Sequence, residues 1–406
     1  MEILRPRDEA QLAEVITEAN HQKMALEVAG AGTKRALGRP VDAERIVCTG
    51  AMFGVSLYEP EDLVVTVKTG TPVRFLEETL SRQGQMLGFE PLDLGPVLGQ
   101  NPGEGTIGGL FATNLCGSRR LQVGSARDHL LGMTAVNGLG QQISVGGRVM
   151  KNVAGYDLTR NIAGSWGTLG VMTEVTMRVM PKPEDAATLI FYGLLDELAI
   201  ELMAKAMKTP CEVSGAVHIQ EPLVAGIGDE KLRRADTAIT AIRIENQAAS
   251  VEFRLKFLKD ILDSFGPIEV LERDRSDKFW AEMRELKLMQ NTDTPFWRIT
   301  TAPSNGVDIV AAIKAHHPNS VAVYDWSGGL IWLLTPFTAD AGASEVHRAV
   351  VNRGGNATLM RGELALRASA DVFQPVEEGM AVLARKIKAA FDPNGILNPG
   401  RMYSYC

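Results

Sequence analysis

The stretch VAGAGTKRALGRP, residues 28–40, places two glycines one residue apart directly after an apolar run that predicts a strand. Successive backbone N–H groups in such a turn form a concave anion site, and glycine lets a ligand approach the backbone closely. A Walker A loop is excluded because it needs four residues between its first glycine and Gly-Lys-Ser/Thr. A Rossmann fingerprint is excluded because Arg35 stands where its third glycine belongs. An ordinary glycine-rich β-turn remains the alternative at this point.

The overall composition excludes several classes of function. The chain has 406 residues, enough for two or three domains, and a net charge of −7, which argues against nucleic-acid binding. The polar, acidic N-terminus does not have the pattern of a secretory signal, and no apolar run reaches the length of a membrane span. We therefore expect a cytoplasmic protein with reduced thiols and no transmembrane segment.

The cysteines and histidines do not predict a metal centre. No C-x-x-C pair is present, which argues against an iron–sulfur cluster or zinc ribbon in this chain; the four cysteines are Cys48, Cys116, Cys211 and Cys406. The adjacent His316 and His317 would point in different directions, and no HxH or HExxH pairing occurs. We expect no bound metal.

The first half of the chain mixes short strands with helices. Apolar spacing predicts helices at 8–21 and 72–83, the second with Pro72 in its first turn. Strands are expected at 24–29, 45–48 and 63–67, in a hairpin around Asn137-Gly138-Leu139-Gly140, and in the alternating run GTLGVMTEVTMRVMP. Pro181 and Pro183 then mark a linker.

The second half of the chain has a different pattern of predicted elements, in which strands and helices alternate. This pattern predicts an α+β domain with an antiparallel sheet covered by helices on one face. Helices are expected near 195–208, 247–264, 276–289, 306–315, 340–352 and 375–390. Strands are expected near 213–219, 237–244, 296–301, 320–325 and 329–335.

A second glycine-rich tract, from about residue 88 to 126, is longer than a loop that only joins two elements of secondary structure. Its glycines would let the backbone pass close to a planar or anionic ligand. They are Gly103, Gly105, Gly108 and Gly109. Short polar side chains that reach such a ligand follow in the same tract, namely Thr106, Thr113, Asn114 and Ser125.

With both glycine tracts in this order, the chain resembles the vanillyl-alcohol oxidase / p-cresol methylhydroxylase (PCMH) group of flavoproteins. The resemblance implies an α+β fold with a PCMH-type, two-subdomain FAD-binding domain at 1–182. An antiparallel-sheet α+β cap domain on the substrate side then follows at 183–390. A C-terminal segment, 391–406, would return to the FAD domain, because FDPNGILNPGRM resembles the closing motif of the group.

The resemblance also implies which residues hold FAD. The first loop would bind the pyrophosphate, and it comprises Ala29, Gly30, Ala31, Gly32, Thr33 and Lys34. The second tract would contribute Thr106, Gly108, Gly109, Ala112, Thr113, Asn114 and Ser125, and the adenine end would meet Gly170 and Val171. Lys34 or Arg35 would offset the phosphate charge. Some members of the group attach the flavin covalently through a histidine in the first loop. Because 28–40 has no histidine, and His129 lies in the RDHLLG strand, we expect noncovalent FAD.

A narrower resemblance, carried by GGRVMKNVAGYDLTR, GSWGTLGV and NPGRMY, is to the FAD-binding subunits of bacterial glycolate oxidases. It implies a small 2-hydroxy acid as substrate and two partner subunits, a sister flavoprotein and an iron–sulfur protein. The localisation it implies is cytoplasmic or, through the complex, peripheral to the inner membrane.

The catalytic residues stay unknown. Related 2-hydroxy-acid dehydrogenases resemble one another in an HxxGDGN-type metal motif and a Glu-His-Gly segment, and neither is found here; NRGGNATLMRG has Asn356 instead. Lys151, Tyr156, Asp157, Arg361 and Arg401 are candidate substrate-side or flavin-side groups, each with a structural role as the alternative. For Trp326 and Trp332, packing is the favoured interpretation. Two hypotheses therefore stay open: this chain oxidises the substrate, or it holds FAD and transfers electrons while its sister flavoprotein does so.

Overall fold

The computed structural model describes residues 1–147, 157–290 and 292–404, and the chain forms two compact units. Unit 1 comprises Met1–Cys116, Gly124–Lys182 and Pro375–Cys406, and unit 2 comprises Gly117–Val123 and Pro183–Gln374. The sequence-based domain limits differ from these units in two places. A short excursion at 117–123 belongs to unit 2, and the C-terminal return to unit 1 begins at Pro375 rather than at 391.

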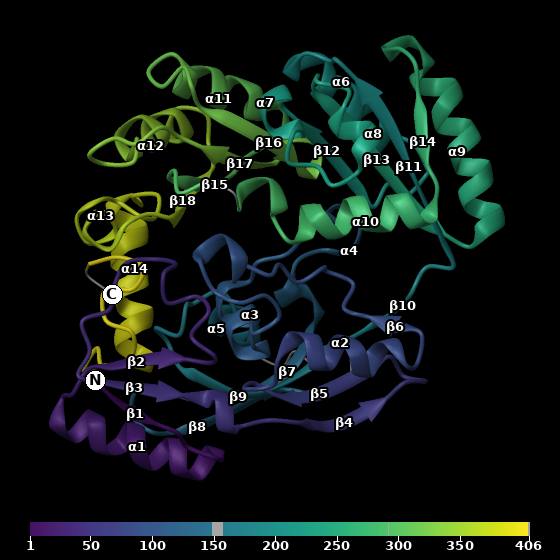
Figure 1. The fold of residues 1–406 in the computed structure, drawn as a ribbon. Helices are drawn as coiled ribbons and strands as arrows, with labels where there is room; N and C mark the ends of the chain where they lie inside the picture. Colours follow the sequence, from purple (N-terminus) through teal and green to yellow (C-terminus); the bar gives the residue numbers. More distant parts are fainter. Residues whose placement is uncertain (148–156, 291, 405–406) are drawn as a thin grey trace. The chain divides into compact units, whose positions relative to one another are not determined.

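Unit 1 contains a parallel sheet and a larger antiparallel sheet (Figure 1). The parallel sheet has the order β1-β3-β2, and the five-stranded antiparallel sheet has the order β4-β5-β9-β7-β8. The parallel strands are β1 (Glu2–Leu4), β2 (Leu26–Ala29) and β3 (Arg45–Cys48). The antiparallel strands are β4 (Val55–Glu59), β5 (Val64–Lys68), β7 (Leu130–Val136), β8 (Gln142–Gly146) and β9 (Val171–Arg178), with β6 (Gln85–Met86) and β10 (Met180–Pro181) as a separate pair.

Helix α1 (Glu9–Gln22) covers the parallel sheet (Figure 1). It begins at Asp8, whose carboxylate accepts a hydrogen bond from the N–H of Gln11 at 2.8 Å, a typical N-cap. Its buried Leu12 and Ile16 pack on Leu26, Val47 and, from the far end of the chain, Leu397. The core under the first glycine loop is therefore completed by the C-terminal segment. The remaining helices of the unit are α2 (Val73–Ser81), α3 (Ile107–Thr113), α5 (Leu158–Ile162) and α14 (Glu378–Phe391).

Unit 2 is built on an eight-stranded sheet with the order β14-β11-β13-β12-β16-β17-β15-β18, in which all neighbouring strands are antiparallel. The predicted α+β class with an antiparallel cap sheet is confirmed. The strands are β11 (Asp185–Tyr192), β12 (Gly215–Ile219), β13 (Ile239–Asn246), β14 (Glu269–Leu271), β15 (Phe296–Thr300), β16 (Val321–Asp325), β17 (Leu330–Leu334) and β18 (Asn356–Arg361).

Helices lie on both faces of this sheet, so the sequence-based prediction that only one face is covered is wrong. On one face, Leu189 of β11 packs in a buried cluster with residues of α6 (Asp196–Met207) and α9 (Ala248–Leu262). The preceding residue, Thr188, points to the other face, as alternation along a strand requires, and accepts a hydrogen bond from the Trp280 indole of α10 (Arg273–Arg284) at 2.9 Å. The other helices of the unit are α4 (Arg120–Val123), α7 (Glu221–Val224), α8 (Glu230–Arg233), α11 (Gly306–Lys314), α12 (Ala343–Val351) and α13 (Leu364–Ser369).

The excursion Gly117–Val123 is held in unit 2 by buried polar contacts. Ser118 donates a hydrogen bond to the Asp325 carboxylate at 2.7 Å, and the Trp326 indole donates one to the carbonyl of Gly117 at 3.0 Å. Arg119 forms an ion pair with Glu245, and both side chains are almost fully buried. These contacts explain why seven residues of the second glycine tract leave unit 1.

Candidate functional site

The first glycine loop begins where β2 ends and turns without entering a helix, as the sequence predicts. Gly32 has a φ of +82°, a conformation that glycine adopts without strain. Within the loop, the N–H of Arg35 donates to the carbonyl of Gly32 at 3.1 Å, and the N–H of Leu37 donates to that of Lys34 at 3.0 Å. The loop is therefore a pair of short turns, and among the described residues the backbone N–H groups of residues 30–34 have no backbone partner.

The second loop lies directly against the first. A β-carbon on Gly30 would overlap the hydroxyl of Thr106 and lie 3.1 Å from its methyl group, so only glycine fits there. Thr106 is the N-cap of α3, where its hydroxyl faces the N–H of Gly109 at 3.4 Å. Added β-carbons at Gly105 and Gly109 would lie 3.7 and 3.6 Å from the Lys34 ammonium. The two glycine tracts thus approach each other as the family resemblance implies.

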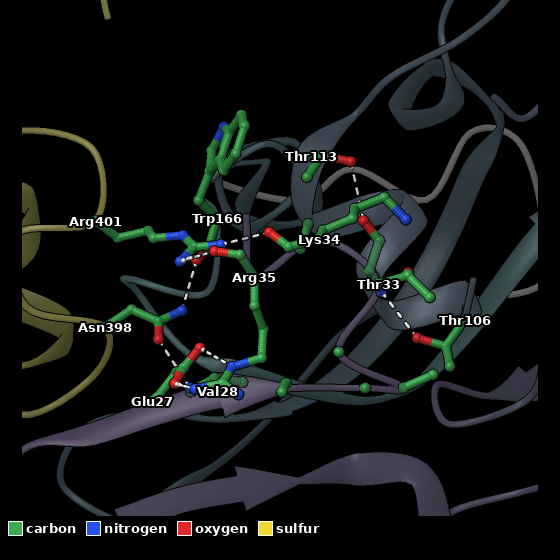
Figure 2. A pocket seen from close by; sticks show the side chains of 16 residues that line it. Glu27, Val28, Thr33, Lys34, Arg35, Thr106, Thr113, Trp166, Asn398 and Arg401 are labelled. Atoms are coloured by element: carbon green, nitrogen blue, oxygen red, sulfur yellow. Dashed lines mark hydrogen bonds and ion pairs between the residues drawn. The ribbon is translucent and has the colours of Figure 1, made fainter. Parts of the chain in front are cut away.

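A pocket opens between these loops (Figure 2). Four parts of unit 1 line it: residues 27–35; residues Thr106, Gly109, Ala112 and Thr113 around α3; Trp166; and Asn398 and Arg401 of the C-terminal segment. Ten of the fifteen predicted cofactor residues are in this lining, namely Ala29, Gly30, Ala31, Gly32, Thr33, Lys34, Thr106, Gly109, Ala112 and Thr113.

The charged side chains of the lining are one carboxylate, Glu27, and three cations, Lys34, Arg35 and Arg401. Arg35 is committed to Glu27, because its guanidinium donates to both carboxylate oxygens at 2.7 and 2.6 Å. Figure 2 shows Arg35 turned toward Glu27, on the side of the pocket away from the Lys34 side chain. The described lining therefore carries two positive charges in excess, a suitable environment for a diphosphate.

Lys34 is the cation best placed to neutralise a ligand. Burial lowers the pKa of its ammonium to about 8, and the negative charge of Asp93 acts against this shift. Among the described residues, no hydrogen-bond acceptor is assigned to its ammonium. The sequence left Lys34 and Arg35 as equal candidates for the phosphate charge, and the ion pair of Arg35 with Glu27 favours Lys34.

Two lining residues come from the C-terminal segment. The Asn398 amide accepts a hydrogen bond from the N–H of Val28 and donates one to the carbonyl of Trp166, both at 2.8 Å. The Arg401 guanidinium donates to the carbonyl of Lys34 at 2.7 Å. Sequence reasoning named Arg401 as a group near the flavin but missed Asn398, which it treated only as part of the closing motif.

Trp166 was also missed. Its backbone has a φ of +56°, and its N–H donates to the carbonyl of Ala112 at 2.9 Å, so the residue is held at the end of α3. The ring is partly exposed and lines the pocket (Figure 2). A flat aromatic surface at a pocket edge is suited to stacking on a nucleobase. The signal in the sequence was a tryptophan enclosed by two glycines, Gly164 and Gly167, in GSWGTLG.

Five predicted cofactor residues lie outside the pocket lining. Gly108 packs on Thr69, and the Asn114 amide accepts a hydrogen bond from the N–H of Arg127 at 2.9 Å. Ser125 shares a capping box with Asp128 in the turn Ala126–His129, Gly170 packs on Val136, and Val171 pairs with Val136 in the sheet. Their positions support the loops, and direct contact with FAD stays a prediction for them.

The candidate substrate-side residues do not gather at one place in the described chain. Lys151 and Tyr156 lie outside the described residues. Asp157 is the N-cap of α5 and accepts a hydrogen bond from Arg160 N–H at 3.1 Å. The remaining candidates serve packing: the Arg361 guanidinium donates to the carbonyls of Thr294 and Met289, and Trp326 and Trp332 are buried.

The described residues contain no group of three or more His, Cys, Asp or Glu side chains that could hold a metal ion. His129 is fully buried, with its ring edge against Phe89 at a centroid distance of 5.2 Å. Within the described chain, no helix has the length and apolar character needed to cross a membrane.

Comparison with protein families gives two matches. Residues 2–146 match the family described as FAD binding domain, and residues 374–402 match the C-terminal domain of FAD linked oxidases. The first match includes both glycine loops. The second begins one residue before the C-terminal return to unit 1 and includes Asn398 and Arg401.

Similar proteins cover the whole chain. The glycolate oxidase subunit GlcE of Escherichia coli (strain K12) is 33% identical over 404 residues, covering 99% of both chains. The glycolate oxidase subunit GlcD of Bacillus subtilis (strain 168) is 24% identical and covers 99% of this chain and 88% of that protein. The D-lactate dehydrogenase of Archaeoglobus fulgidus is also 24% identical, covering 98% and 90%.

Solved structures share the fold at low sequence identity. p-Cresol methylhydroxylase superposes with a TM-score of 0.73 at 15% identity, covering 98% of this chain and 88% of that one. The 4-ethylphenol oxidase of Gulosibacter chungangensis gives the same TM-score and identity, with 99% and 88% covered. These likenesses confirm the predicted PCMH-type architecture.

Proposed function

This chain belongs to the FAD-linked oxidase family that includes glycolate oxidase subunit GlcE, with FAD as its cofactor, and we propose that it is the FAD-binding subunit of a glycolate oxidase complex. In this role it oxidises glycolate or a similar small 2-hydroxy acid to the 2-oxo acid and passes the electrons to a partner. The observation that carries the proposal is the pocket formed by the two glycine loops and the C-terminal segment. The chain that contains this pocket is similar to GlcE over 99% of its length.

The residues of the pocket fit FAD. Each phosphate of its pyrophosphate carries a negative charge, and the lining supplies an excess of two positive charges. Among the residues that the structure describes, the Lys34 ammonium has no hydrogen-bond acceptor. Gly30 leaves no side chain between the loops, and the positive φ of Gly32 is the kind of turn in which successive N–H groups would face a bound anion. Trp166 offers a ring on which the adenine would stack.

Bound FAD supplies the two-electron redox chemistry, and the protein positions it. The chain's own residues bind and orient. Lys34 and the loop amides would hold the pyrophosphate. Thr33 and Thr106, both buried, line the same pocket and offer hydroxyl groups to it. Because the first loop has no histidine, we propose that FAD is held without a covalent bond.

The substrate and the partners are proposed from the relatives. GlcE and GlcD are by name subunits of glycolate oxidase, and a further relative is a D-lactate dehydrogenase, so a small 2-hydroxy acid is the common substrate class. We propose a sister flavoprotein and an iron–sulfur protein as partners. The alternative is that this chain transfers electrons and the sister flavoprotein oxidises the acid.

The test is the visible spectrum of the purified chain, recorded anaerobically before and after glycolate is added. Loss of the flavin band would support direct oxidation by this chain. A band that persists with the chain alone, but is lost once the sister flavoprotein is supplied, would support electron transfer. A band that glycolate and D-lactate leave unchanged under both conditions would overturn the proposal.

A further inference from the structure

The C-terminal segment that follows α14 is anchored by a buried ion pair. Lys388, near the end of α14, donates to the Asp392 carboxylate at 2.7 Å and to the carbonyls of Thr168 and Leu397 at 2.7 and 2.8 Å. Asp392 is buried and also accepts the N–H groups of Ile396 and Leu397. All three ammonium hydrogens and both carboxylate oxygens are used, so this anchor fixes where the segment starts.

From this anchor the segment runs beside β2, the strand that leads into the first glycine loop. The N–H of Leu26 donates to the carbonyl of Ile396 at 2.8 Å, and the N–H of Asn398 donates to the carbonyl of Leu26 at 2.9 Å. This parallel bridge between Leu26 and Leu397 extends the three-stranded sheet by one short partner. The segment therefore reaches the loop in a fixed register.

Beyond the bridge, two buried side chains bond to the loop itself. Asn398 caps the N–H of Val28, and Arg401 donates to the carbonyl of Lys34 at 2.7 Å and more weakly to those of Arg35 and Arg39 at 3.5 and 3.4 Å. In return, the N–H of Arg39 donates to the carbonyl of Arg401 at 3.1 Å.

Gly38 makes room for this contact. Its φ is +78°, and an added β-carbon would lie 3.3 Å from the Arg401 Nε. These bonds go to the backbone of the loop, so they set its shape whether or not a ligand is present. Among the described residues, the loop's own turn bonds are those from Arg35 to Gly32 and from Leu37 to Lys34, so the bonds from the segment add to the contacts that hold its conformation.

Resting on the proposed FAD function, we propose that residues 392–401 are a latch for the pyrophosphate loop, with Asn398 and Arg401 as positioning residues. A ligand that binds only the latched loop stabilises the latch, and the latch raises the affinity for that ligand by the same factor. The ligand class is a nucleoside diphosphate, and the adenosine diphosphate half of FAD suffices.

The test uses the full-length apo chain, ADP and FAD as ligands, and the variants Arg401→Gln, Arg401→Lys and Asn398→Ala. Arg385→Gln is the matched control, because Arg385 lies on α14 in an exposed ion pair with Glu378. Affinities come from calorimetry, and protection of 392–401 comes from amide hydrogen exchange with and without ADP. A thermal scan of each apo variant confirms that it is folded.

In the wild type and the Arg385 variant, we expect ADP to slow exchange in 392–401. In Arg401→Gln and Asn398→Ala, we expect ADP and FAD to bind about tenfold or more weakly, with the ADP-dependent slowing lost. Arg401→Lys should stay weakened, because one ammonium cannot reproduce the guanidinium fork.

Three results would overturn the latch: unchanged ADP affinity in folded Arg401→Gln, full recovery in Arg401→Lys, or exchange that ADP does not slow in the wild type. A wild-type chain that binds neither FAD nor ADP would instead contradict the proposed function. The two failures are therefore distinguishable.

Discussion

Gly30 and Thr106, 76 positions apart in the printed sequence, lie so close that a β-carbon on Gly30 would overlap the threonine hydroxyl. This contact brings the two glycine tracts to a single pocket. Neither tract alone distinguishes a ligand site from an ordinary turn, and their contact is the reason we propose an anion site here.

Replacement of Gly30 by valine should abolish FAD binding. The added side chain would separate the loops and fill the approach to the backbone amides, a steric cost of several kcal/mol, on the order of other overpacked sites. The ratio of flavin to protein absorbance of the purified variant measures this. Gly379→Ala, where a β-carbon meets nothing within 4 Å, is the control and should keep its flavin. Normal flavin content in Gly30→Val would refute the loop assignment.

Replacement of Lys34 by methionine should weaken FAD binding by about 1.5–3 kcal/mol, the usual range for a hydrogen bond to a charged group. Riboflavin, which has no phosphate, should bind both proteins alike, and Lys34→Arg should recover part of the loss. Fluorescence titration of the apo proteins gives the affinities. Equal FAD affinity for Lys34→Met and the wild type would leave Lys34 without a role.

The same lysine predicts a pH dependence. In the free chain, burial lowers the pKa of Lys34 to about 8, below its usual value, and a bound phosphate would raise it again. Below pH 8 the ammonium is already charged and affinity should be flat. As the pH rises above 8, binding must take up a proton, so FAD affinity should fall. Lys34→Met should not show this fall. A wild-type affinity that does not change up to pH 9.5 would contradict the prediction.

Trp166 should report on adenine binding. It is the only tryptophan of unit 1, so a change of tryptophan emission on ADP binding should vanish in Trp166→Phe. Stacking of a base on an aromatic side chain is worth about 1–3 kcal/mol, so Trp166→Ala should bind ADP correspondingly more weakly. Trp332→Phe, in unit 2, is the control and should keep the emission change. If that control loses the change instead, the adenine is not at Trp166.

In unit 2, Arg119→Met should destabilise the fold strongly. Arg119 pairs with Glu245, which keeps a second cation, Arg243, at 3.2 Å. The variant would therefore remove one charged hydrogen bond from a buried carboxylate, at a cost of about 1.5–3 kcal/mol. Arg234→Met, which removes an exposed pair with Glu230, should cost about 0–0.5 kcal/mol. Urea unfolding compares the two. Equal midpoints would mean that the excursion 117–123 is not held by this ion pair.

Local patterns predicted much of the fold. The helices at 8–21, 195–208 and 247–264 and the strand at 45–48 were found within a few residues of their observed ends. Strand β11 was missed, because residues 186–191 are buried on both faces and show no alternation, and the prolines before it favoured a linker. Strand β18 was missed because Gly354-Gly355 predicted a turn where the strand begins.

The candidate site was predicted where glycine spacing carries the signal, and missed where distant partners carry it. Thr33, Lys34 and Thr106 belong to loops that the sequence marks locally. The role of Asn398 depends on Val28 and Trp166, 370 and 232 positions away, and an asparagine before Pro-Gly predicts only a turn. The predicted helix at 375–390 was assigned to the cap domain, because the contacts that place it in unit 1 are also distant in sequence. One of them is the hydrogen bond from Lys388 to the carbonyl of Thr168.

The most direct measurement is the flavin content of the purified chain before and after denaturing precipitation. The account predicts a flavin band in the native protein, close to one FAD per chain, with all of it released into the supernatant. A chain that carries no flavin and cannot be reconstituted with FAD, or one whose flavin stays with the precipitate, would contradict it.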